Sequence, residues 1–169
     1  KITQQNSPPT TYPTKLPKPT KSVLFNPPTP SRITLQNGIE VLFIKRDKTP
    51  LVTMSVYIKN GSTLDPHNYP GLTYLTSQLL QEGTSKYSSK EIASILEGMG
   101  TNIVTKINRE SISLSSQAIA HIWPKVFSLL SHIIMDPTFS EHDINRIKNE
   151  HIADLYRLQD EPGWISDRI

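Results

Sequence analysis

The chain contains no cysteine among its 169 residues. That absence excludes a disulfide, a thiolate nucleophile and any zinc site built on cysteine sulfur. Any metal site would have to use histidine and carboxylate ligands instead. The lack of cysteine does not indicate the cellular compartment, because cysteine-free chains are compatible with both reducing and oxidising surroundings.

Long apolar runs are also missing. Hydrophobic residues make up 36% of the chain, and no run approaches the ~20 residues that a membrane-spanning helix needs. The first residues carry no charged-then-apolar segment of the kind that directs export, so we expect any signal peptide to be absent from this chain. These features predict one globular domain with no membrane span, long enough to bury about two thirds of its unfolded surface.

The folded body lacks an excess of either charge. The formal net charge is +3, but residues 1–30 carry four lysines and no acid, which leaves 14 basic against 15 acidic residues elsewhere. A surface that binds nucleic acid is therefore not expected. The same 30 residues hold eight of the 14 prolines, a composition that resists both helix and sheet. We interpret residues 1–30 as an extended linker between an export signal or lipid anchor and a body over residues 31–169. A tail without a role is the alternative.

What the body does contain is strand patterning at its start. The pair Asn37-Gly38 stands between two β-rich runs and predicts a hairpin. Alternation of apolar and polar residues over 51–58 predicts a third strand. After an intervening helical stretch, residues 101–107 and 110–117 predict a second hairpin, whose serine-rich second strand has one polar face.

Helical patterns follow these strands and close the chain. Ser88 and Glu91 form a capping box that opens a short helix, and an apolar stripe over 122–134 predicts a longer one that ends at Asp136-Pro137. Antiparallel strands with helices packed on one face define an α+β fold with a mostly antiparallel sheet. A last helix is predicted after Ser140-x-x-Asp143, with one face formed by Ile144, Ile147, His151, Leu155 and Leu158.

The most informative stretch is residues 71–84, which read Gly-Leu-Thr-Tyr-Leu-Thr-Ser-Gln-Leu-Leu-Gln-Glu-Gly-Thr. It resembles the active-site helix of the pitrilysin/insulinase metallopeptidases, the inverted zincins with a His-x-x-Glu-His motif. The resemblance extends over roughly residues 31–169, including the Gly-Ser-x-x-Asp loop at 61–65 and the turn at 136–139. Family members are longer, with two similar halves per subunit, so we expect an amino-terminal fragment that stops within the first half.

The resemblance implies that the functional positions of the motif are lost. Tyr74 stands for the first zinc histidine, Ser77 for the general-base glutamate and Gln78 for the second histidine. Asp154 falls where the third ligand, a glutamate, is implied, and Ile147 where an auxiliary glutamate is implied. Zinc needs nitrogen, thiolate or carboxylate ligands, and a serine hydroxyl alone does not take a proton near neutral pH. We therefore expect no catalytic residue and no zinc, with Asp154 a hydrogen-bonded carboxylate facing the former cavity.

A second candidate for metal binding is the pair His151 and Asp154, which lie three residues apart on the expected last helix. No third ligand accompanies them at a matching spacing. A packed histidine beside a helix-surface carboxylate is the favoured interpretation, and a metal pair is the alternative. The remaining histidines are scattered and receive no role: His67, His121, His132 and His142.

The resemblance also implies a peptide-binding edge. Within the family, the free strand beside the zinc helix accepts an extended peptide through main-chain hydrogen bonds. The chain departs from the family's pattern here, since active members have Asn-Ala where it has Val-Thr. The corresponding residues are Thr101, Asn102, Ile103, Val104 and Thr105.

Two functions from different classes follow. The first is a non-catalytic subunit of a heterodimeric zinc peptidase, which completes the proteolytic chamber and contributes to binding a peptide or unfolded protein. Zinc is then expected only in an active partner subunit that carries His-x-x-Glu-His. The alternative is a stand-alone peptide-binding or scaffold module that has lost protease activity. The expected location is the bacterial periplasm or cell envelope, with the mitochondrion as the alternative.

Overall fold

The structure is a computed structural model that describes residues 26–46 and 48–160 and divides into two compact units, Lys1–Arg46 and Asp47–Ile169. The first unit holds a hairpin in which β1 (Ser31–Thr34) pairs antiparallel with β2 (Glu40–Phe43). Gly38 in the connecting turn has φ 85°, a left-handed backbone that glycine adopts without a steric penalty. The predicted Asn-Gly hairpin is thus confirmed. Most of the predicted linker lies outside the described residues.

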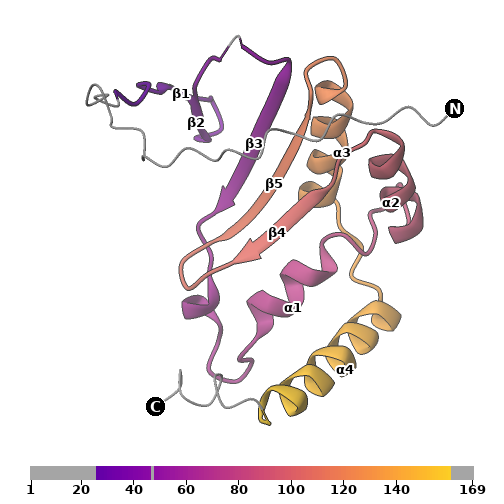
Figure 1. Cartoon of the computed structure of the whole chain (residues 1–169). Helices are drawn as coiled ribbons and strands as arrows, with labels where there is room; N and C mark the ends of the chain where they lie inside the picture. The colour runs from indigo at the N-terminus through magenta and orange to yellow at the C-terminus, as the bar shows by residue number, and fades with distance from the viewer. Residues whose placement is uncertain (1–25, 47, 161–169) are drawn as a thin grey trace, which may run out of the picture. The chain divides into compact units, whose positions relative to one another are not determined.

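The second unit is built on a three-stranded antiparallel sheet (Figure 1). Its strands are β3 (Leu51–Ile58), β4 (Ile103–Ile107) and β5 (Ile112–Ile119), in the order β3-β5-β4. Along β3, exposed and half-buried residues alternate, as the sequence predicts. β4 and β5 form the predicted second hairpin. The central strand β5 therefore pairs with a neighbour in sequence on one side and with a distant strand on the other.

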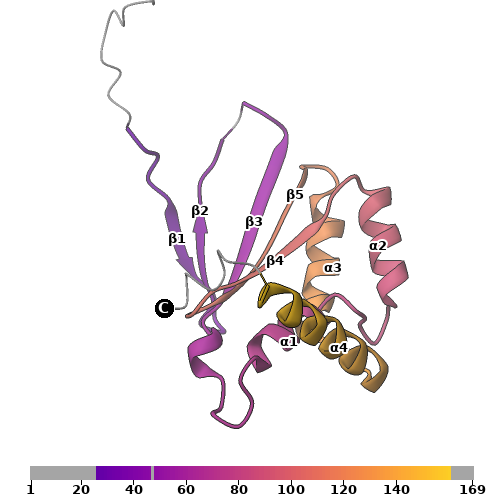
Figure 2. The same ribbon diagram turned by 60° about the horizontal axis from the view of Figure 1, so that its bottom comes forward.

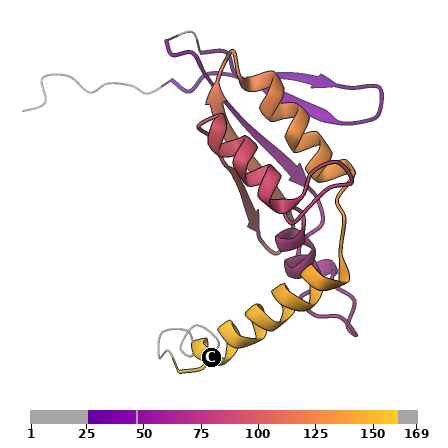
Figure 3. The ribbon, with the colours of Figure 1, turned by 90° about the vertical axis from the view of Figure 1, so that its right-hand side faces the viewer.

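Two helices cover one face of this sheet (Figure 3). α2 (Ser89–Gly98) begins at the predicted capping box, in which Glu91 accepts a hydrogen bond from the Ser88 amide at 2.8 Å. α3 (Trp123–Met135) buries the predicted apolar stripe and ends before Pro137. This arrangement confirms the α+β fold with helices on one face of a mostly antiparallel sheet. The core between sheet and helices consists of Leu80, Ile92, Leu96, Ile103, Ile112, Leu114, Leu129, Leu130 and Ile133.

The remaining helices lie beyond one end of the sheet (Figures 1 and 2). A short 3-10 turn, η1 (Ser62–Leu64), precedes α1 (Leu72–Leu79), and α1 contacts α4 (Glu141–Leu158). The predicted inner face of α4 is the less exposed one, with Ile147 buried. None of the helices in the described residues has the length and apolar character to cross a membrane.

Candidate functional site

Helix α1, which carries the altered motif, is held at its start by a carboxylate from the preceding loop. Asp65 accepts hydrogen bonds from the amides of Gly71 and Thr73, both at 2.8 Å, and from the Thr73 hydroxyl at 2.6 Å. These bonds satisfy amide groups that the first turn of a helix leaves unpaired. The Thr73 hydroxyl, followed by the amide bonds, outweighs the opposing effect of burial and lowers the pKa of Asp65 from its ordinary value of 3.8.

The loop before α1 is also fastened to the turn between β4 and β5. The amide of Thr63 and its hydroxyl both donate to the carbonyl of Arg109, at 3.0 and 2.7 Å. Gly61 lies so close to this turn that a Cβ added there would stand 2.3 Å from the carbonyl carbon of Arg109. The Gly-Ser-x-x-Asp segment therefore sets where α1 begins through one close backbone approach and one capping carboxylate.

The three motif positions on α1 have separate surroundings. The Tyr74 ring stacks on the ring of His151 from α4, with centroids 3.9 Å apart and planes 25° from parallel. Ser77 is 1% exposed, and its hydroxyl donates to the carbonyl of Tyr74 at 2.7 Å. Gln78 is exposed. Tyr74 thus packs between two helices, Ser77 is buried and bonded to the backbone of its own helix, and Gln78 is exposed to solvent.

Asp154, at the position implied for the third ligand, lies at the surface of α4. Its side chain is 54% exposed and accepts a hydrogen bond from Arg157 at 3.0 Å. The expected hydrogen-bonded carboxylate is confirmed. A carboxylate between packed helices would lose hydration without gaining a partner, whereas the exposed Arg157 offers one.

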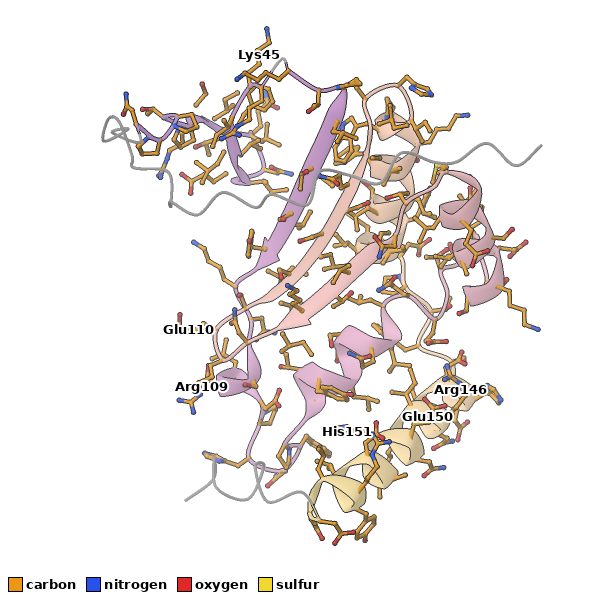
Figure 4. All side chains as sticks on the ribbon, in the orientation of Figure 1. Lys45, Arg109, Glu110, Arg146, Glu150 and His151 are labelled. Carbon is orange, nitrogen blue, oxygen red and sulfur yellow. The ribbon has the colours of Figure 1, made fainter. Side chains whose placement is uncertain are left out.

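His151 is the packed histidine that the sequence favours over a metal pair. It is half-buried and its ring lies against Tyr74, while Asp154 is bonded to Arg157. Figure 4 shows His151 on the side of α4 that faces α1. Across residues 26–46 and 48–160, no three histidine, aspartate or glutamate side chains gather in a way that could hold a metal ion. A phenol, an amide and an exposed, ion-paired carboxylate do not fit zinc.

A second link between α1 and α4 is an ion pair that sequence reasoning missed. Arg146 on α4 contacts Glu82, just after α1, at 2.6 Å, and Glu150 on its own helix at 3.1 Å. The hydrogen bond to Glu82 first, and that to Glu150 second, raise the pKa of Arg146. The four-residue spacing of Arg146 and Glu150 is readable as a helix-surface pair. The pairing with Glu82 is not, because it depends on how the two helices pack.

The predicted peptide-binding edge corresponds to β4, which begins two residues later than expected. Thr101 precedes the strand, with its hydroxyl donating to the carbonyl of Gln117 at 2.7 Å, and Asn102 is exposed. Ile103 is buried, and the Thr105 hydroxyl accepts a hydrogen bond from Gln81 at 3.0 Å. Val104 is exposed. Within the described part of the second unit, β4 pairs with β5 alone, so its outer edge keeps unpaired backbone groups.

Comparisons with known proteins agree with this geometry. Residues 40–167 match the family described as insulinase, peptidase family M16. The uncharacterized zinc protease YmxG of Bacillus subtilis is 22% identical over 134 residues, covering 79% of this chain and 33% of that protein. The non-peptidase homolog YmxG of Helicobacter pylori is 19% identical over 131 residues, covering 78% and 30%. The probable mitochondrial-processing peptidase subunit alpha-1 of Arabidopsis thaliana is 22% identical over 165 residues, covering 92% and 33%.

A solved structure with a similar fold is the peptidase M16 inactive domain from Pseudomonas fluorescens. It superimposes with a TM-score of 0.77 at 24% identity, covering 82% of this chain and 34% of that one. The chain spans about a third of the length of the curated relatives described above. Those relatives include both a zinc protease and a non-peptidase homolog at similar identity, so they do not decide activity. The family match covers most of the chain, and the chain belongs to the insulinase family, peptidase family M16.

Proposed function

We propose that this chain is a non-catalytic subunit of a heterodimeric zinc peptidase, in which it completes the proteolytic chamber and contributes to peptide binding. The observation that carries the proposal is the contact between Tyr74 and His151. At the position that the family resemblance gives to the first zinc histidine, a phenol ring packs against a second helix. An aromatic contact joins α1 to α4 where an active member needs an imidazole nitrogen free to bind zinc.

The chemistry of the other motif positions supports the same proposal. A general base must reach a water molecule and take its proton near neutral pH. The Ser77 hydroxyl is buried and donates to a backbone carbonyl of its own helix, so it does neither. Gln78 offers a neutral amide. Peptide-bond hydrolysis is therefore assigned to a partner subunit that carries zinc and an intact His-x-x-Glu-His motif.

A part in substrate binding is supported by the open edge of β4. Unpaired backbone groups on a sheet edge accept an extended peptide as an added strand, and this interaction needs no metal. The name of the Arabidopsis relative, a subunit of a processing peptidase, supports a place in an assembly of more than one chain. The proposed location is the bacterial periplasm or cell envelope, and the mitochondrial relative favours the mitochondrion as the alternative.

The experiment is to purify the protein from its source and to identify what accompanies it. We expect a chain with an intact His-x-x-Glu-His motif at equal stoichiometry. We also expect the mixture to hydrolyse an unfolded peptide well above the rate of either chain alone, with loss of activity in a chelator. Peptide binding by this protein alone, with no accompanying peptidase, would instead favour the stand-alone module. Chelator-sensitive hydrolysis by the isolated protein would overturn the proposal.

A further inference from the structure

We infer that the open edge of β4 selects extended peptides that carry acidic side chains, and that Lys106 is the residue that sets this preference. The inference rests on the proposed use of β4 as a peptide-binding edge and adds a substrate class to it. It follows from which side chains border the edge and which charges around it are already neutralised.

The side chains of β4 alternate between the two faces of the sheet. Ile103, Thr105 and Ile107 are buried or half-buried, and Ile103 belongs to the core beneath the helices. Val104 and Lys106 are exposed on the opposite face. A strand added to this edge would lie about 4.8 Å from β4. Every second side chain of that strand would then stand beside Val104 and Lys106.

The end of the sheet at which Lys106 lies is basic. The register places Ile58, Ile112 and Ile107 side by side across the three strands, so Lys59 and the turn after β4 share that end. That turn contains Arg109 and Glu110, which Figure 4 shows on the loop beyond the strands. Three cations, Lys59, Lys106 and Arg109, therefore share this end with Glu110 and with Asp65, whose carboxylate is occupied by its hydrogen bonds to Gly71 and Thr73.

Among the described residues, none of these three cations forms an ion pair. The ion pairs of the second unit lie on α4 and at the end of α1. Across the sheet, Lys106 lies beside Ser113, and Ser113 lies beside Tyr57, so both neighbours in this row are neutral. Its charge is thus available to a ligand. A carboxylate on an added strand gains a favourable contact there, and a lysine on that strand meets a like charge.

The side chains of α1 that border the same edge are neutral. Gln81, a neutral amide just after α1, donates a hydrogen bond to the Thr105 hydroxyl there, and the neutral side chains of Tyr74 and Gln78 lie on α1. Glu82, just after α1, and Glu150 on α4 are both held by Arg146. Neither of these two carboxylates is therefore free to pair with a basic peptide. Lys106 and the basic end of the sheet therefore determine which peptide charge the edge prefers.

The test measures binding of three fluorescent ten-residue peptides of equal length and apolar content, with glutamate, glutamine or lysine at alternate positions. Fluorescence anisotropy with the whole chain should rank the affinities glutamate, then glutamine, then lysine. Since exposed ion pairs are weak, each step is expected to be about two- to fivefold. Lys106→Glu should reverse this ranking. Lys125→Glu is the matched control, because Lys125 is an exposed lysine on α3 and its loss changes net charge equally.

A fourth peptide, the glutamate sequence with alternate backbone amides methylated, separates the inference from the proposed function. Its binding should be lost, since N-methylation removes the donors that pair with a sheet edge. Equal binding of the three charge variants, with methylation still abolishing binding, would overturn the acidic preference and leave edge binding intact. Binding that survives methylation, or binding of no peptide at all, would overturn both. If Lys125→Glu reversed the ranking of affinities as strongly as Lys106→Glu, the preference would come from net charge alone. The role given to Lys106 would then be overturned.

Discussion

The ring of Tyr74 on α1 lies almost flat against the ring of His151 on α4, with centroids 3.9 Å apart. Aromatic pairs of this kind are worth about 0.5–1.5 kcal/mol beyond the area they bury. We expect Tyr74→Ala and His151→Ala each to destabilise the fold. In a double-mutant cycle monitored by urea unfolding, the two changes should couple by about that amount.

The control for this cycle is Tyr156→Ala on the same helix. Tyr156 is 67% exposed, so its loss should change the free energy of unfolding by less than about 0.5 kcal/mol. Tyr74→Phe should behave as wild type, because the stack uses the ring and not the hydroxyl. Strictly additive effects of Tyr74→Ala and His151→Ala would contradict the stacking interaction as a source of stability.

A second prediction concerns the motif itself. The wild-type chain should hold no stoichiometric zinc, and the triple change Tyr74→His, Ser77→Glu and Gln78→His should not produce an efficient peptidase. Position 77 is 1% exposed, so a glutamate there is expected to cost stability. Asp154 stays exposed and bonded to Arg157, and supporting groups around a metal matter by ~10–100-fold.

Elemental analysis and peptide hydrolysis with and without a chelator check this prediction. About one tightly held zinc per wild-type chain, lost on Asp154→Ala, would show that a metal site exists. A metal that remains after Asp154→Ala and sits elsewhere on the surface would not bear on the motif. Efficient hydrolysis by the triple variant would show that the missing ligands are the only defect.

A third prediction follows from the close approach of Gly61 to the β4–β5 turn. A methyl group at this position would stand 2.3 Å from the backbone of Arg109, so Gly61→Ala should destabilise the fold by about 1–3 kcal/mol. The matched control is Gly98→Ala at the end of α2, where nothing lies within 4 Å of the added Cβ. That change should be neutral or stabilise by up to about 1 kcal/mol. Equal unfolding midpoints in urea for both variants would contradict the close approach.

The fourth prediction is a pH dependence from Asp65. Its pKa is lowered in the folded state, first by the Thr73 hydroxyl and then by backbone amides, so the ionised form favours folding. Its contribution should be fully present above pH 3.8 and lost as the pH falls below that value. Asp65→Asn should therefore lower the Tm at pH 7, and the gap to wild type should narrow in acid. If the difference in Tm between wild type and Asp65→Asn stayed constant from pH 7 to pH 3, the loss of stability would come from the shape of the side chain and not from its charge.

Much of the fold could be predicted because its signals are local. The Asn37-Gly38 turn, the alternation along β3 and the Ser88–Glu91 capping box each lie within a few residues, and each forms as expected. The order β3-β5-β4 could not be predicted, since it depends on pairing between strands far apart in the chain. Periodicity shows which face of a strand is buried but not which neighbour it takes.

The site shows the same division. The residues at the motif positions could be identified from the sequence, because residues 71–84 keep the spacing of the motif. The contacts that those residues make could not be predicted, because the Tyr74–His151 stack and the Arg146–Glu82 ion pair both join segments that meet only when the helices pack. The partner of Asp154, Arg157, was not predicted for a related reason. A neighbour three residues along its own helix competes for the carboxylate, and only side-chain packing decides which partner wins.

The central position of β5 has a consequence for how the chain folds. β4 and β5 are joined by a short turn, so their pairing closes a small loop and carries little entropic cost. β3 must instead find β5 across the whole segment that contains α1 and α2, with Leu51 pairing with Ile119. Pairing across such a separation is slow. Until β3 arrives, one edge of β5 stays open to other chains, and this interval is when the protein is most exposed to aggregation during its synthesis.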